Sequence, residues 1–201
     1  MVFTGAAACA AEPLPRALAE SAPADTRTLL QWVLNSDDAR GRPFAVVDKR
    51  AARIWVFDGT GRLAGTAPAL LGQATGDDSV PGVGSRPPAT IALHERTTPA
   101  GRFLSEPGHN SKGEAIVWVD YAAAVAIHRL RSAPAEERRP QRLASDSPDD
   151  NRISLGCVVV SAAFFDAVVA PTLGQRAGVV YVLPETRPLQ AVFGPMVAEA
   201  L

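Results

Sequence analysis

The sequence predicts a mainly β fold, with mixed sheets in a β-sandwich-like arrangement and one or two short helices. Seventeen prolines and 16 glycines divide the 201 residues into short segments, many of them rich in valine, which is typical of strands joined by turns. Hydrophobic residues make up 47% of the chain and charged residues 20%, as in packed globular proteins, so most of the chain is not disordered. The length suits a single domain with a short appendage.

The charge and the length of the apolar runs exclude two classes of partner. Twenty Lys and Arg residues oppose 21 Asp and Glu residues, for a net charge of -1, without the basic footprint of a protein that binds nucleic acid. No apolar run reaches the ~18 to 20 residues that span a bilayer, and the run over residues 115–130 is interrupted by Asp120 and His128. We therefore expect no nucleic-acid partner and no membrane span.

Residues 1–25 are expected to be a leader remnant or a linker. The small residues that end at Ala11 resemble the stretch before a signal-peptidase site, although a basic n-region is missing and the apolar stretch is short. We interpret them as the end of an export signal, which predicts a periplasmic or otherwise exported protein. Lipidation of Cys9, in a sequence that faintly resembles a lipobox, and a plain disordered N-terminus are the alternatives.

Residues 26–42 are expected to form a short amphipathic helix, over residues 26–34, and a connection to the main domain. This domain is expected to span residues 43–185, with a C-terminal tail over residues 186–201. Strands are predicted where β-forming residues alternate or run continuously, at residues 44–48, 53–57, 62–71, 115–120, 125–130, 158–160 and 179–183.

Two long irregular segments are expected inside the domain. Residues 72–88 are rich in Gly and Pro, which predicts an extended surface loop. Residues 132–151 are polar and are expected to form an excursion that contains one turn of helix. Ser161 is expected to cap a helix over residues 162–169.

Most catalytic templates are missing from the sequence. It contains no phosphate-binding loop, dinucleotide fingerprint or nucleophile elbow. The three histidines, at positions 94, 109 and 128, are scattered, and their spacing does not indicate a metal site. We expect neither a metal nor another cofactor.

Cys157 is the candidate nucleophile. It is the only cysteine outside the N-terminal segment, so a mature exported domain would have no internal disulfide. It follows Gly156 and precedes a predicted strand, where backbone N–H groups can face a developing oxyanion and glycine allows a substrate to approach closely. His128 is a chemically suitable base for the thiol. The alternative is that Cys157 is a small buried hydrophobic residue.

These residues resemble the catalytic motif of the L,D-transpeptidases, cysteine enzymes that remodel bacterial peptidoglycan. The family has a histidine on a strand, matched by Ile-His at residues 127–128, and later the motif S-H-G-C, matched by Ser-Leu-Gly-Cys at residues 154–157. The sequence TPAGRF at residues 98–103 matches the family's TPxGxF turn. The opening strands and the elements after the cysteine also fit, so the resemblance covers about residues 43–184.

The resemblance implies acyl transfer on peptidoglycan stem peptides. Cys157 would attack the carbonyl of the third residue of a stem tetrapeptide, and His128 would move the thiol proton to the departing D-alanine. The N–H groups of Gly156 and Cys157 would stabilise the oxyanion, while Leu155 contributes only its backbone and Ser154 braces the loop. A second amine would resolve the thioester, giving a 3→3 cross-link or an anchored protein, and water would give carboxypeptidase activity.

Three positions depart from the family pattern. Leu155 replaces a histidine, Val159 stands where Arg or Asn commonly helps to bind substrate, and Arg129 follows His128 in place of Gly. Arg152, Arg142 and Arg129 are the candidates for a substrate-carboxylate contact, because a guanidinium can hold a carboxylate with two hydrogen bonds. Plain solvation at the surface is the alternative for Arg152 and Arg142.

The sequence also allows two other functions. The apolar residues at positions 155 and 159 favour a peptidoglycan-binding module that keeps the fold without turnover. Retention of both Cys157 and His128 favours an enzyme, because a binding module has no chemical need for this pair. The third interpretation is an intracellular β-rich protein in which the cysteine is structural.

Overall fold

The computed structural model describes Leu18 and residues 21–194. Most of the expected leader, including the possible lipidation site Cys9, lies outside the described residues. Within the part of the chain that is described, no helix is both long enough and apolar enough to cross a membrane.

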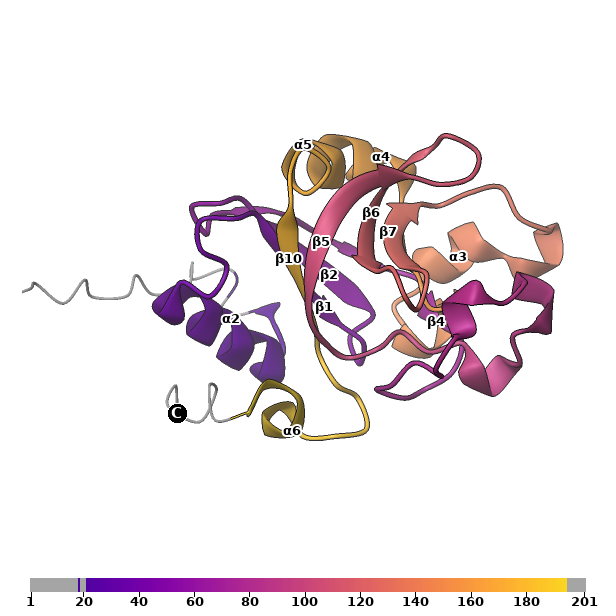
Figure 1. The fold of residues 1–201 in the computed structure, drawn as a ribbon, viewed down its shortest axis with the longest axis horizontal. Helices are drawn as coiled ribbons and strands as arrows, with labels where there is room; N and C mark the ends of the chain where they lie inside the picture. Colours follow the sequence, from indigo (N-terminus) through magenta and orange to yellow (C-terminus); the bar gives the residue numbers. More distant parts are fainter. Residues whose placement is uncertain (1–17, 19–20, 195–201) are drawn as a thin grey trace, which may run out of the picture.

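A large eight-stranded sheet forms the body of the domain (Figure 1). Its neighbouring strands pair antiparallel, except that β1 with β10 and β7 with β9 are parallel. This confirms the prediction of a mainly β fold with mixed pairing. In spatial order the strands are β3 (Leu63–Pro68), β2 (Arg53–Phe57), β1 (Phe44–Asp48), β10 (Gly178–Val182), β5 (Gly101–His109), β6 (Ala115–Asp120), β7 (Val125–Arg129) and β9 (Val158–Val160), and a small parallel sheet pairs β4 (Leu71–Gly72) with β8 (Arg152–Ser154).

The helical segments are short apart from the first. Ser161 caps the segment after β9 as expected, since its Oγ accepts the Phe164 N–H at 3.1 Å. The α- and π-helical segments are α2 (Ala24–Ser36), α3 (Arg139–Leu143), α4 (Ala162–Phe164), the π-helical turn Phe165–Val169, α5 (Ala170–Thr172) and α6 (Leu189–Phe193). Single 3-10 turns lie at Val83–Ser85, Pro88–Thr90, Leu93–Glu95, Ala135–Glu137 and Pro148–Asn151.

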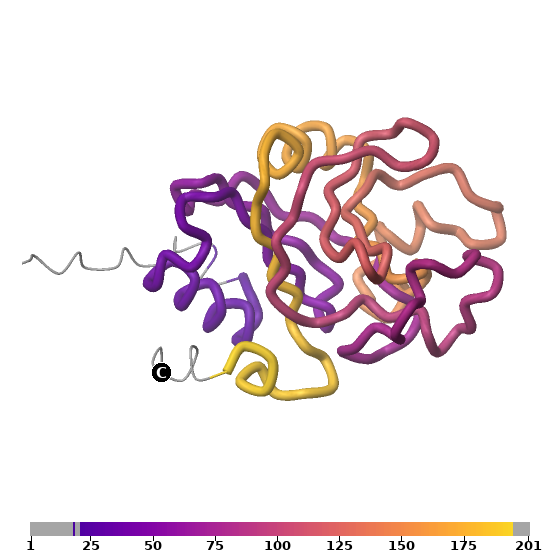
Figure 2. The backbone as a smooth tube through the Cα atoms, viewed as in Figure 1, coloured from indigo at the N-terminus to yellow at the C-terminus, as the bar shows by residue number. Residues whose placement is uncertain are grey.

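The large sheet bends so far that strands near its two ends share one core. Ile54 of β2 and Val158 of β9 belong to the same buried cluster, although five strands lie between β2 and β9 in the sheet. Phe165 and Val169, from the helical segment after β9, belong to this cluster too. The bend is visible in the path of the backbone (Figure 2), and it makes the architecture nearly barrel-like.

Two helices cover the opposite face of β1, β2 and β10. Leu29 and Val33 of α2 pack in one buried cluster with Phe44 and Tyr181 from the sheet. Phe193 of α6 joins the same cluster, and α2 and α6 lie on the same side of the molecule (Figure 1). The described part of the expected C-terminal tail therefore packs on the domain through α6.

A third, small apolar cluster lies on the face of β9 that points away from the main core. Val159 packs there with Leu70 and Leu143, and the backbones of Leu70 and Val159 exchange two N–H···O bonds of 2.8 Å. Leu143 is the last residue of α3, so the polar segment 132–151 is held over this face by an apolar contact. Cys157 is partly buried against the same cluster.

Four predicted strands have the observed bounds, two differ by one residue (β7 and β10), and one divides. β1, β2, β6 and β9 begin and end as predicted. The strand predicted over residues 62–71 instead divides into β3 and β4, because the chain changes partners after β3. Ala69 donates its N–H to the Ala52 carbonyl beside β2, and Leu70 then pairs with Val159 of β9.

Candidate active site

His128 lies on β7, and Cys157 directly precedes the neighbouring parallel strand β9. His128 pairs with Val159 of β9, and Ile127 pairs with Val158. Paired residues share a face of a sheet, and faces alternate along each strand. Cys157, His128 and Val159 therefore share the face that points away from the main core, which we call the thiol face. Strands about 4.8 Å apart, with about 3.3 Å per residue, place the Cα atoms of Cys157 and His128 about 8 Å apart.

The Cys157 thiol lies against the turn between β6 and β7. Its Sγ donates to the carbonyl oxygen of Ala124 over 3.6 Å, and Ala124 has a left-handed φ of 54°. Burial raises the pKa of the Cys157 thiol, and the backbone N–H of Ala126 and the charge of Arg131 oppose this only in part. At neutral pH the group therefore rests as a thiol and not as a thiolate.

The His128 imidazole is buried and neutral. Its Nδ1 makes a 2.7 Å hydrogen bond with the Arg129 carbonyl oxygen, and because a carbonyl only accepts, Nδ1 carries the proton and Nε2 keeps a free lone pair. Burial, assisted by the charges of Arg131 and Arg139 and opposed by the Arg129 bond, lowers the pKa of His128 to about 4. The ring can thus act as a base at pH 7. Among the described residues, no hydrogen bond joins it to the Cys157 thiol.

The Ser154 hydroxyl closes the loop that carries the thiol. Its Oγ donates to the Cys157 carbonyl at 2.7 Å and accepts the Gly156 N–H at 3.1 Å. The Gly156 N–H is therefore already bound, whereas the Cys157 N–H has no backbone partner in the described part of the chain. Leu155, at the tip of the loop, is 40% exposed.

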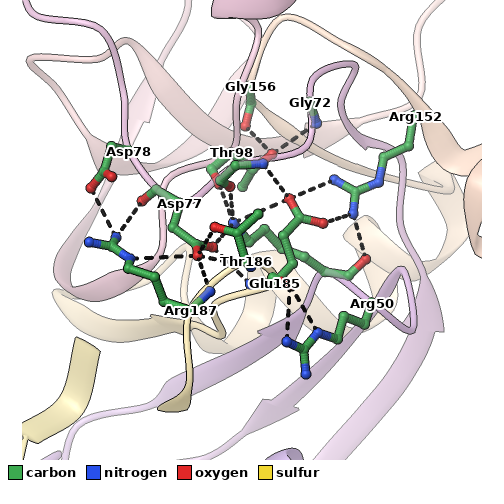
Figure 3. Close-up of polar contacts among 12 residues, drawn as sticks. Arg50, Gly72, Asp77, Asp78, Thr98, Arg152, Gly156, Glu185, Thr186 and Arg187 are labelled. Carbon is green, nitrogen blue, oxygen red and sulfur yellow. Dashed lines mark hydrogen bonds and ion pairs between the residues drawn. The ribbon is translucent and has the colours of Figure 1, made fainter. Parts of the chain in front are cut away.

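Thr98 connects this loop to another part of the chain. Its Oγ1 donates to the Gly156 carbonyl at 2.9 Å and accepts the Gly72 N–H at 2.8 Å (Figure 3). Gly156 has a φ of 134°, and a Cβ there would lie 2.8 Å from the Thr97 carbonyl oxygen, so this position requires glycine. Sequence reasoning placed Thr98 in the TPxGxF turn without assigning it a contact, because its partners lie far away along the chain.

A buried ionic network lies beside Thr98 (Figure 3). Lys49 is 0% exposed, and its Nζ donates to the Thr98 carbonyl at 3.0 Å and to Asp77 Oδ1 at 2.8 Å. Asp77 also accepts the backbone N–H groups of residues 185–187. Burial raises the pKa of Asp77, but these hydrogen bonds and the Lys49 charge outweigh it and hold the pKa well below its usual range. Lys49 reads as a turn residue in the sequence, so sequence reasoning missed this network.

Two of the arginines predicted to contact substrate are bonded within the chain. Arg152 forms an ion pair with Glu185, and its side chain is 15% exposed. Arg142 donates to the carbonyl oxygens of Glu137 and Asp150 at 3.0 Å each, and it lines a cavity of about 330 Å³ on the segment that covers the thiol face. Both guanidinium groups therefore contribute to the architecture around the loop, and a substrate contact for either stays a prediction.

The third predicted arginine and a further one lie at the end of β7. Arg129 donates to Asp166 at 2.7 Å, with its guanidinium 4.3 Å from the centre of the Phe165 ring, on the face opposite the imidazole and the thiol. Arg131 pairs with Glu114 at 2.9 Å and is 36% exposed. Its positive charge lowers the pKa of both the imidazole and the thiol. Sequence reasoning did not single out Arg131, because nothing in the local pattern distinguishes it from its neighbours.

The described surface has cavities of about 220 to 400 Å³ whose lining does not include Cys157 or His128. Residues 18 and 21–194 contain no group of three or more His, Cys, Asp or Glu side chains that could hold a metal ion. The reactive groups of the site are a partly buried thiol and a neutral imidazole.

Comparison with known proteins gave matches among solved structures. No protein-family model matches the chain, and no curated protein sequence matches it. The matched structures are mostly L,D-transpeptidase catalytic domains. An L,D-transpeptidase in complex with imipenem is 21% identical with a TM-score of 0.39, and one from Xylanimonas cellulosilytica is 17% identical with a TM-score of 0.42. A helical cell shape determining protein from Campylobacter jejuni is 13% identical with a TM-score of 0.46.

These matches share part of their length with the chain. They extend over 70%, 70% and 73% of this chain, which in turn spans 58%, 60% and 49% of the two L,D-transpeptidases and the cell shape determining protein. At these identities the likeness to the L,D-transpeptidases concerns the fold alone.

Proposed function

We propose that the chain is a divergent L,D-transpeptidase, a cysteine acyltransferase that acts on peptidoglycan stem peptides in the bacterial cell envelope. The observation that carries the proposal is that Cys157, directly before β9, and His128 of the parallel neighbour β7 share one face of the sheet. The loop before the thiol, with the sequence Ser-Leu-Gly-Cys, is braced by Ser154. Cys157, His128 and this loop supply a nucleophile, a base and a backbone N–H donor for the oxyanion, which acyl transfer requires.

The first half-reaction forms a thioester. Cys157 rotates its Sγ from the Ala124 carbonyl toward the imidazole, and His128 Nε2 takes the thiol proton as Sγ attacks the carbonyl carbon of the third stem residue. The new S–C bond replaces the C–N bond to D-alanine, and the imidazolium returns its proton to the departing amine. The raised pKa of the thiol and the lowered pKa of the imidazole mean that proton transfer accompanies attack and does not precede it.

The oxyanion of the tetrahedral intermediate needs a donor. The Cys157 N–H has no backbone partner among the described residues, whereas the Gly156 N–H is bound to Ser154. We therefore assign the oxyanion contact to the Cys157 N–H, and Gly156 supports it by allowing the close approach of a substrate. Leu155 takes part through its backbone only.

The second half-reaction returns the free thiol. An amine attacks the thioester carbonyl, the C–S bond breaks, and the amine proton passes through His128 to Cys157 Sγ. A stem-peptide amine gives a 3→3 cross-link, a protein lysine gives an anchored protein, and water gives a carboxypeptidase. Arg152, Arg142 and Arg129 stay candidates for a substrate carboxylate, and Arg131 joins them because its charge acts on both the thiol and the imidazole.

A peptidoglycan-binding module without turnover is the second candidate function. The apolar cluster of Val159, Leu70 and Leu143 favours it, because this cluster covers the thiol face where the family has a polar residue. An exported location is part of both candidates.

Intact-protein mass spectrometry tests the proposal. The chain is mixed with a stem tetrapeptide that contains diaminopimelate, and we expect an adduct with the mass of the tripeptidyl acyl group on the wild type and none on Cys157→Ser. Co-sedimentation with isolated sacculi is measured in parallel. Binding to sacculi by both variants, without an adduct and without release of D-alanine, would support the binding module instead.

A further inference from the structure

The direction of the Cys157 N–H is coupled to the carbonyl of the residue before it. The Gly156 C=O and the Cys157 N–H belong to one peptide unit, and in a planar trans peptide the two groups point in opposite directions. No cis peptide bond is present among the described residues. Because Thr98 Oγ1 donates to the Gly156 carbonyl over 2.9 Å, this bond turns the Cys157 N–H away from Thr98.

The Thr98 hydroxyl has one arrangement available. It is 0% exposed and accepts the Gly72 N–H at 2.8 Å. An N–H group only donates, so the single hydroxyl proton of Thr98 is left for the Gly156 carbonyl (Figure 3). Rotation of the Gly156–Cys157 peptide would leave that proton unpaired in a buried place, which is unfavourable.

The backbone of Thr98 is itself held from two sides. Lys49 Nζ donates to its carbonyl at 3.0 Å and is neutralised by Asp77 at 2.8 Å. A Cβ on Gly72 would lie 2.6 Å from the Thr98 nitrogen, and a Cβ on Gly156 would lie 2.8 Å from the Thr97 carbonyl oxygen. The two glycines therefore enclose this backbone closely, and the hydroxyl has little freedom to move.

We propose that Thr98 is a positioning residue for acyl transfer, with its hydroxyl aiming the Cys157 N–H at the oxyanion that forms on the substrate carbonyl and Lys49 anchoring Thr98. The inference rests on the proposed function of Cys157. Ser154 already binds the Gly156 N–H. The direction of the Cys157 N–H therefore decides how well the oxyanion is stabilised. Such a donor acts in the transition state and contributes little to the binding of substrate.

The test compares acyl transfer with thiol reactivity. Thr98→Val removes the hydroxyl at nearly constant volume, Thr98→Ala removes it with less steric demand, and Thr98→Ser keeps it. Thr90→Val is the matched control, because it removes an exposed threonine hydroxyl that donates to the Pro87 carbonyl. Acylation is measured with the stem tetrapeptide and with p-nitrophenyl acetate, which contains no part of a stem peptide. Alkylation is measured with iodoacetamide, which the thiol attacks without forming an oxyanion.

We expect the kcat for acylation to fall by about tenfold to a hundredfold in Thr98→Val and Thr98→Ala, with KM changed by less than about twofold. Thr98→Ser and Thr90→Val retain wild-type acylation, and alkylation stays within about twofold of wild type in every variant. Acylation of the wild type by the ester but not by the tetrapeptide would contradict the substrate assignment, while the loss in Thr98→Val on the ester would still support the positioning role.

Three results would overturn the positioning role. The first is wild-type acylation by Thr98→Val and Thr98→Ala when circular dichroism shows both to be folded. The second is a fall in alkylation that parallels the fall in acylation, because it would mean that the whole loop has collapsed. The third is a Thr98→Ser variant as slow as Thr98→Val. A wild type that neither donor acylates would overturn this role and the proposed function together.

Discussion

Val159 and His128 occupy the same register position of the parallel pair β7–β9, so the imidazole shares its face of the sheet with an apolar residue. Val159 packs there with Leu143 of α3, which holds segment 132–151 over the thiol face. At this position the side chain makes apolar packing contacts, where the motif that the sequence resembles has Arg or Asn. α3 and β9 therefore form an apolar surface on the face that Cys157 and His128 share.

The buried His128 predicts a pH-dependent stability. Its pKa is about 4 in the folded chain against 6.5 for an exposed histidine, so the unfolded chain binds more protons between these values and the free energy of unfolding falls as the pH falls. We expect a loss of about 2 kcal/mol between pH 7 and pH 5. Urea unfolding at several pH values measures it, and His128→Gln removes this loss whereas His109→Gln, at an exposed position, keeps it. Equal slopes for wild type and His128→Gln would contradict the buried neutral ring.

Arg131 predicts the reactivity of the thiol. Its charge lowers the pKa of Cys157, which burial raises, so Arg131→Gln increases the pKa further and decreases the thiolate fraction. The rate of alkylation by iodoacetamide at pH 8 is expected to fall severalfold, while in the wild type it still rises between pH 8 and pH 9. Arg62→Gln, whose side chain is 86% exposed, serves as the control, and a similar fall in this control would show that net charge and not Arg131 sets the rate.

The buried Lys49–Asp77 pair predicts a large loss of stability when the Lys49 charge is removed. Lys49→Met removes the closer of the two charged partners of the Asp77 carboxylate, which is 1% exposed, and leaves Arg187 at 3.6 Å. We expect the free energy of unfolding to decrease by about 3 kcal/mol. Thermal and urea unfolding measure the change. The neighbouring variant Arg50→Met removes an exposed pair with Asp25 and is expected to cost less than about 1 kcal/mol. Equal decreases in the free energy of unfolding for the two variants would show that the buried pair stabilises the fold no more than the exposed pair.

The backbone conformation of Gly156 predicts that the loop over residues 154–157 does not tolerate a side chain at this position. Gly156→Ala places a Cβ 2.8 Å from the Thr97 carbonyl at a φ of 134°, which we expect to cost about 1 to 3 kcal/mol and to shift the loop enough to reduce acylation. Gly113→Ala has a φ of 78° but open space around the new Cβ, so it measures the backbone cost without the clash. Unfolding and acylation assays compare the two, and unchanged acylation in Gly156→Ala would mean that the loop can adjust.

Much of the fold was predictable because it depends on local patterns. β1 and β2 have near-continuous runs of β-forming residues between turns, and their observed bounds match the predicted ones. The mainly β class followed from many short segments separated by Gly and Pro. The predicted strand over residues 62–71 divides because Leu70 has a better partner in Val159, and no local pattern carries information about that distant partner.

The candidate reactive groups could be named from the sequence, whereas the residues that hold the loop around the thiol could not. Cys157 and His128 were named from side-chain chemistry and from the resemblance. The Lys49–Asp77 pair and the Thr98 contact depend on residues separated by 28 and 58 positions, and each residue reads locally as part of a turn. The burial of a charged residue such as Lys49 follows only from the assembled fold.

The most direct test of the central claim is mass spectrometry of muropeptides. Diaminopimelate-containing tetrapeptide muropeptides are incubated with the wild type and with Cys157→Ala. We predict loss of the terminal D-alanine, with cross-linked dimers or tripeptides formed by the wild type only. Equal turnover by Cys157→Ala would contradict the role of this thiol, and unchanged muropeptides in both samples would contradict the proposed acyl transfer on this donor.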